Sequence, residues 1–194
     1  MSKGSRRERD QQVGVDLGLT DDEKKKLREI ARTVIEHRAQ NKPVPRFEID
    51  SEKLNEKRGA FVSLHKGGQL RGCIGNIRGR QALCQTVAEM AEEAAFNDPR
   101  FTPVSKGELK DLDIEISALT PLRQIENVEE IEVGRHGLYI EKGFFSGLLL
   151  PQVATEYGWD RETFLEQTCY KAGIHKDAWK EKDTKVFIFS ADIF

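Results

Sequence analysis

Long apolar segments are missing from this sequence. The longest apolar run, residues 147–151, is far shorter than the roughly 20 residues that a helix needs to span a bilayer. Residues 1–10 are charged and polar, and they contain no apolar stretch of the kind found in secretory signal peptides. We therefore expect a cytosolic protein that does not enter a membrane.

Cysteine and histidine are scarce and scattered. The three cysteines lie far apart, no Cys-x-x-Cys pair occurs, and the four histidines are spread along the chain. Structural zinc sites need closely paired ligands, and an odd cysteine count without a secretory signal favours reduced thiols. Neither a phosphate-binding Gly-Lys-Ser/Thr sequence nor the dinucleotide fingerprint is present. We therefore expect neither a metal nor a cofactor.

The sequence also has no excess of positive charge. Its 31 Lys and Arg residues face 33 Asp and Glu residues, which gives a net charge of -2. Affinity for nucleic acid or for an anionic membrane depends on concentrated positive charge, usually with aromatic side chains interleaved when bases are stacked. We therefore expect no nucleic-acid binding, while the balance is still compatible with a small anionic ligand held by a few basic residues.

Apolar residues are sufficient for a core, since they make up 38% of the 194 residues. This predicts one domain, or two small units that share a core, over residues 19–194, preceded by a loosely held polar tail over residues 1–18. Thr20 and Glu23 have the spacing of a capping box at the start of an amphipathic helix that ends before Pro43. Further expected helices follow residues 79, 105, 151 and 160, and expected strands cover residues 61–65, 70–77, 113–119, 138–141, 144–150 and 185–189. Helices and hairpins do not alternate strictly, which predicts an α+β fold with antiparallel sheets and flanking helices.

The most informative stretch is residues 67–75, which places four glycines, one arginine and one cysteine within nine positions. Side chains alternate along a strand, so Arg71 and Cys73 are expected on one face. A neighbouring guanidinium favours a reactive thiolate, and Gly72 and Gly75 allow a ligand or another backbone to approach closely. The plainer interpretation is a tight hairpin in which Cys73 is a small buried hydrophobe and Arg71 pairs with a structural carboxylate.

Three segments in order resemble the AMMECR-type domain family. They are residues 70–75 (Leu-Arg-Gly-Cys-Ile-Gly), residues 97–101 (Asn-Asp-Pro-Arg-Phe) and residues 147–154 (Gly-Leu-Leu-Leu-Pro-Gln-Val-Ala). The resemblance continues to about residue 192. It implies an α+β fold with a larger lobe that holds both termini, a smaller lobe and a cleft between them. It implies no established activity, but it suggests action beside MEMO-type and radical S-adenosylmethionine proteins.

The resemblance singles out three more candidate ligand-binding residues. Asp98 could pair with Arg71, and Arg100 could bind an anion through two hydrogen bonds, although a structural ion pair would explain both equally well. Gln152 could contact a ligand or satisfy buried backbone groups. Lys171, which is off the apolar face of its helix, could reach either the cleft or solvent.

Two classes of function are open at this point. In the first, the cleft is a small-molecule or covalent site that uses Cys73 as a nucleophile, with Arg71 and Arg100 holding an anionic substrate. In the second, the protein is a non-catalytic binding or assembly component, and its glycine-rich motif is a docking surface. The sequence does not decide whether the protein is an enzyme.

Overall fold

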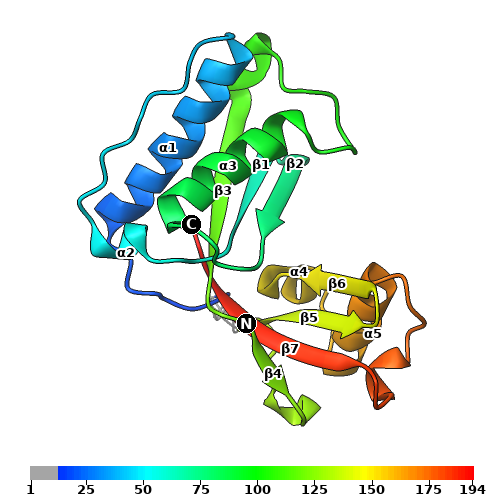
Figure 1. Ribbon diagram of the computed structural model, residues 1–194. Helices are drawn as coiled ribbons and strands as arrows, with labels where there is room; N and C mark the ends of the chain where they lie inside the picture. Colours follow the sequence, from blue (N-terminus) through cyan, green and yellow to red (C-terminus); the bar gives the residue numbers. More distant parts are fainter. Residues whose placement is uncertain (1–12) are drawn as a thin grey trace, which may run out of the picture.

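A computed structural model describes residues 13–194 (Figure 1). The larger lobe contains the elements α1 (Asp21–Ala39), α2 (Glu52–Asn55), β1 (Ala60–Lys66), β2 (Gln69–Asn76), α3 (Leu83–Phe96), η1 (Lys106–Asp111) and β3 (Leu112–Leu119). The smaller lobe contains β4 (Arg123–Ile125), η2 (Val128–Glu130), β5 (His136–Lys142), β6 (Phe145–Leu149), α4 (Pro151–Glu156), α5 (Arg161–Lys171) and η3 (Ala178–Lys180). The last strand, β7 (Lys185–Ile193), runs through both lobes.

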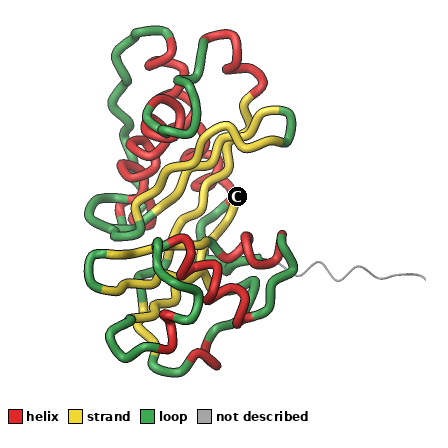
Figure 2. Tube along the Cα trace, turned by 90° about the vertical axis from the view of Figure 1, so that its right-hand side faces the viewer, coloured by secondary structure: helices red, strands yellow, loops and turns green. Residues whose placement is uncertain are grey.

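One antiparallel sheet passes through both lobes in the order β2-β1-β3-β7-β5-β6, with β4 also paired to β7. The first six residues of β7 pair with β5, residues 186–188 among them also pair with β4, and the last three residues pair with β3. The sheet is curled, and helices α1 and α3 cover one face of its β1–β3 part (Figures 1 and 2). The predicted α+β class with antiparallel pairing and two lobes is therefore confirmed.

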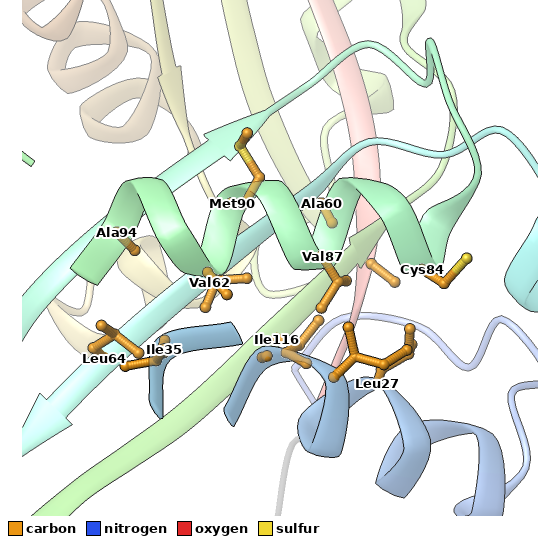
Figure 3. Packing of buried hydrophobic residues seen from close by; sticks show 14 of the residues in the cluster. Leu27, Ile35, Ala60, Val62, Leu64, Cys84, Val87, Met90, Ala94 and Ile116 are labelled. Atoms are coloured by element: carbon orange, nitrogen blue, oxygen red, sulfur yellow. The ribbon is translucent and has the colours of Figure 1, made fainter. Parts of the chain in front are cut away.

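The core of the larger lobe forms where α1 and α3 pack on strands β1 to β3 (Figure 3). Thr20 and Glu23 make the predicted capping box, which satisfies backbone N–H groups at the start of α1. From there Leu27, Ile30, Ala31, Val34 and Ile35 recur at helical spacing and are buried. Strands β1 and β3 direct alternate apolar residues to these helices. Their other face is therefore free to meet the smaller lobe.

The smaller lobe has its own core beneath α5. Phe164, Leu165 and Cys169 of α5 are almost fully buried against β5 and β7. Asp160 caps this helix by accepting a hydrogen bond from the Thr163 N–H. Cys169 is therefore a core residue, as expected from its helical position beside Leu165.

The N-terminal prediction needs correction for the residues that the structure describes. Residues 13–18 were expected to be part of a loose tail, and residues 1–12 lie outside the described range. Val15 donates its N–H to the Ala191 carbonyl, and Leu17 donates its N–H to Asp192 of β7. Polar composition did not reveal this attachment, because it depends on backbone groups of a strand 175 positions away.

Two further elements differ from the prediction. The segment between residues 121 and 137, expected to have little regular structure, contains β4 and η2. The helix expected after Ser105 has the predicted capping box but is a 3-10 helix. In the part of the chain that the structure describes, no helix is long and apolar enough to cross a membrane.

Candidate functional site

The predicted hairpin places Cys73 on an edge strand. β1 and β2 pair antiparallel, with Ser63 opposite Cys73 and Glu115 of β3 opposite Ser63. The Ser63 hydroxyl donates to the Cys73 Sγ at 3.3 Å. Because residues in register share a face, Cys73, Ser63 and Glu115 form a row on the face of the sheet away from α1 and α3. This face meets the smaller lobe.

Asp98 and Arg100 hold the outer edge of β2 at Cys73. Asp98 accepts a hydrogen bond from the Cys73 N–H at 2.9 Å, and Arg100 donates from Nη2 to the Cys73 carbonyl at 3.1 Å. Arg100 also donates to both carboxylate oxygens of Asp98, at 2.9 and 2.7 Å. The two side chains thus take the place of a neighbouring strand, since they satisfy the backbone groups that an edge leaves unpaired.

The same ion pair explains the charge state of Asp98. Its side chain is almost completely buried, while half of the Arg100 side chain is exposed. The Arg100 guanidinium, together with the Cys73 and Arg100 backbone N–H groups, holds the pKa of Asp98 far below its usual range despite the burial. The carboxylate is therefore charged at neutral pH.

Arg71 has a different partner from the one predicted. Its Nε donates to Glu108 Oε1 at 3.0 Å and its Nη2 donates to Glu108 Oε2 at 3.3 Å. Only 13% of the Arg71 side chain is exposed. The expected Arg71–Asp98 pair is therefore wrong, and the plainer interpretation, a structural carboxylate for Arg71, is correct. A guanidinium engaged in this way is not available to activate Cys73.

Both motif glycines are explained by close packing. A Cβ on Gly72 would lie 2.1 Å from the Ala94 carbonyl oxygen of α3, so this residue lets the helix approach the strand. A Cβ on Gly75 would lie 2.2 Å from the Phe61 ring, which covers that residue. We therefore assign Gly72 and Gly75 to packing instead of the expected ligand contact.

A cavity of about 370 Å³ lies between the lobes next to Cys73. Its lining residues from the larger lobe are Phe61, Cys73, Ile74, Asp98, Pro99 and Arg100, and those from the smaller lobe are Leu148, Leu149, Leu150, Val153 and Lys171. The wall is mostly apolar, with the thiol, the Asp98 carboxylate and two cationic side chains added. The cleft implied by the resemblance therefore exists, and Lys171 reaches it.

Gln152 lies at the contact between the lobes, outside the lining of this cavity. Its Nε2 is 3.4 Å from Glu115 Oε1 and 3.5 Å from the Ser117 hydroxyl, and its Oε1 is buried without a hydrogen-bond partner among the described residues. The weak, incomplete bonding makes Gln152 a bridge from α4 to β3. Its neighbour Val153, and not Gln152 itself, is among the residues that line the cavity.

Comparison with known proteins identifies the family. The model of the AMMECR1 family matches residues 28–194. The chain belongs to the AMMECR1 family. A protein from Thermococcus onnurineus is 47% identical over 176 residues, covering 85% of this chain and 86% of the relative, and one from Methanothermobacter thermautotrophicus is 45% identical over 184 residues, covering 91% and 95%. The crystal structure of uncharacterized protein PH0010 from Pyrococcus horikoshii matches with a TM-score of 0.86 at 41% identity, covering 90% of this chain and 92% of that one.

Several cavity residues of this AMMECR1-family chain were not expected from its sequence. Phe61 and Leu148 had been interpreted as strand positions and Val153 as a helix position, and none of the three had been assigned to a site. The alternation of strand β6 gave no sign of a cavity, because its two faces meet different partners in three dimensions. The one available signal was Lys171, a cation placed off the buried face of its helix.

The environment of Cys73 determines the form of its thiol. Burial raises the pKa of Cys73, and this effect outweighs the Ser63 hydrogen bond and the positive charge of Arg100, which both lower it. The positive neighbour is therefore Arg100 and not Arg71. The thiol is neutral at physiological pH, which is unfavourable for a nucleophile.

We expect Cys73 to alkylate slowly, with a pH midpoint above the value of about 8.5 for a free thiol. Iodoacetamide labelling followed by mass spectrometry at a series of pH values measures this midpoint for each cysteine. Arg71→Gln should not change the pH midpoint of Cys73 labelling, because Arg71 forms an ion pair with Glu108. A midpoint below that of a free thiol, raised by Arg71→Gln, would restore the original activation hypothesis.

Proposed function

We propose that this AMMECR1-family protein binds, in the cavity between its lobes, a small molecule with an apolar body and an anionic group. The observation that carries this proposal is the composition of the cavity wall. Phe61, Leu148 and Val153 supply apolar surface, Arg100 adds positive charge from the larger lobe, and Lys171 adds positive charge from the smaller lobe. Binding sites for small molecules commonly combine an apolar wall with a few polar groups that orient the ligand.

The charge balance of the wall favours an anion. The charge of Arg100 is largely compensated by Asp98, with which it forms a close ion pair. Lys171 forms no ion pair with any carboxylate of residues 13–194. One positive charge therefore remains uncompensated beside the apolar wall, where a carboxylate or phosphate would be attracted.

The protonated state of Cys73 favours binding over covalent chemistry in this cavity. A neutral thiol behaves as a small apolar group with weak hydrogen-bonding capacity. We assign Cys73 to the wall that contacts the ligand. Its position within the cavity is set by the Asp98–Arg100 pair, which fixes the backbone of β2.

An assembly role is the second candidate, and exposed aromatic residues favour it. Phe144, Phe145 and Tyr170 are all exposed, and they come from the β5–β6 turn, from the start of β6 and from α5, respectively. Aromatic side chains are enriched in protein–protein interfaces. A MEMO-type or radical S-adenosylmethionine protein as partner, and a cytosolic location, belong to this second proposal.

The first proposal can be tested with hexanoate, a carboxylate with a short apolar chain. We expect saturable binding with a Kd of about 1 mM by isothermal titration calorimetry. Lys171→Gln should weaken this binding about tenfold, because it removes the uncompensated charge. Val153→Trp should abolish binding, since the larger ring fills the cavity.

Two matched comparisons make the result specific. The neutral analogue 1-hexanol should bind at least about tenfold more weakly than hexanoate. Lys176→Gln is the control variant, because Lys176 pairs with Glu166 and does not line the cavity. Equal binding of hexanoate by the wild type and by Val153→Trp would rule out this cavity as the site.

A further inference from the structure

The cavity lies between two strand edges of the curled sheet. Three consecutive residues of the smaller lobe, Leu148, Leu149 and Leu150, all line it. Leu148 and Leu150 pack in one apolar cluster and Leu149 packs in another, so Leu149 borders the cavity through its backbone. The cavity therefore reaches the backbone of β6. Cys73 and Ile74, also consecutive, line it from β2. β2 and β6 are the two ends of the strand order.

The β6 edge carries unpaired backbone groups. Lys142 and Phe145 flank a two-residue turn, and the register continues through Ile140–Gly147 and Leu138–Leu149. In such a hairpin these pairs exchange hydrogen bonds, and the intervening residues Ser146 and Leu148 direct their N–H and C=O groups outward. Among the described residues, no other backbone group forms a hydrogen bond with these N–H and C=O groups. The facing edge of β2 differs, because Asp98 and Arg100 occupy it at Cys73.

Exposed aromatic side chains lead along this edge to the cavity. Phe144 is fully exposed at the turn, and Phe145, at the start of β6, is 56% exposed. The end of α5 lies against the strand, since a Cβ on Gly147 would come within 2.3 Å of the Ala172 nitrogen. This contact places the Tyr170–Lys171 end of α5 beside β6. The edge thus runs from an aromatic surface to a site with positive charge.

We propose that the β6 edge binds an extended peptide that ends in a free carboxylate. The peptide pairs with the outward groups of Ser146 and Leu148, and its last side chain enters the apolar cavity. Its terminal carboxylate lies near Arg100 and Lys171, whose charge it complements. Strand addition of this kind takes affinity from backbone hydrogen bonds and selectivity from a pocket. The inference rests on the proposed function, because it uses the same cavity and names the class of ligand.

The test uses a fluorescein-labelled peptide of alternating threonine and valine that ends in leucine. Fluorescence polarisation compares the free acid with the C-terminal amide, and we expect the amide to bind about tenfold more weakly. A second series carries one backbone N-methyl group at successive positions. Strand addition predicts loss of affinity of about tenfold at every second position, because only alternate N–H groups face β6.

Variants and a competitor separate the possible outcomes. Lys171→Gln should reduce the difference between acid and amide, and Lys176→Gln should preserve it. Hexanoate should displace the acid peptide. If hexanoate binds but acid and amide bind equally, or N-methylation has no alternating effect, the peptide proposal is wrong and the small-molecule proposal stands. If neither hexanoate nor peptide binds, both are wrong. The protein could instead self-associate through β6. If the peptide does not disrupt such self-association, strand addition by the peptide is also contradicted.

Discussion

Replacing Gly72 by alanine should destabilise the protein by about 3 kcal/mol. The new methyl group would lie 2.1 Å from the Ala94 carbonyl oxygen, far inside contact distance. The obstacle is the backbone of α3, which cannot rotate away as a flexible side chain would. Helix and strand must therefore separate, and the packing of α3 on β1 and β2 would loosen. For a chain of this size we expect a fall in Tm of about 6–12 °C.

Gly107→Ala is the matched control for this change. A Cβ at Gly107 meets no atom of residues 13–194 within 4 Å, so its effect should stay within about 0.5 kcal/mol. Differential scanning calorimetry of both variants measures the difference. The experiment also separates packing from ligand contact. Unchanged Tm with lost hexanoate binding in Gly72→Ala would return Gly72 to the ligand-binding residues.

Local patterns in the sequence were sufficient for the elements around the site. The capping box of Thr20 and Glu23 depends on neighbours within a few positions, and it appears in the structure. The alternation along residues 113–119 predicted strand β3, but residues 116–119 are all buried, so burial does not alternate there. The hairpin of β1 and β2 follows from the same alternation and the Gly67–Gly68 turn. Such features are predictable because short-range geometry determines them.

The choice of ionic partners could not be predicted in the same way. Asp98 was the one named candidate for Arg71, and its actual partner, Glu108, also caps η1. Asp98 pairs with Arg100, two residues further along, because the turn directs both side chains to the β2 edge. The sequence shows that these charged residues exist. Which acid pairs with which arginine depends on the path that residues 97–108 take along β2. Predicting the cavity likewise requires knowledge of where β6 lies relative to β2.

The Asp98–Arg100 pair leads to the second large effect. Asp98→Asn should destabilise the protein by about 2–3 kcal/mol at pH 7, because it leaves the Arg100 and Cys73 donors without their charged acceptor. The half-exposed guanidinium can regain water, which keeps the loss below that of a fully buried pair. Hydrogen exchange should show the Cys73 amide among the first to lose protection, since its acceptor is Asp98.

The pH dependence of this loss has a definite sign. The pKa of Asp98 is lower in the folded protein than in the unfolded chain, where it is about 3.9. The carboxylate therefore stabilises the fold above about pH 4, and this contribution is lost as pH falls toward the folded pKa. Urea unfolding should accordingly show a smaller difference between wild type and Asp98→Asn at pH 3 than at pH 7.

Glu108 must be separated from Asp98 in this measurement. Its pKa is also held far below the usual range, chiefly by Arg71, so it adds to the acid sensitivity of the wild type. The double variant Asp98→Asn/Glu108→Gln should therefore be less sensitive to acid than either single variant. Asp113→Asn serves as the surface control, because Asp113 is exposed and forms no ion pair with residues 13–194. A constant difference between wild type and Asp98→Asn from pH 3 to pH 7 would show that Asp98 acts through shape and not through charge.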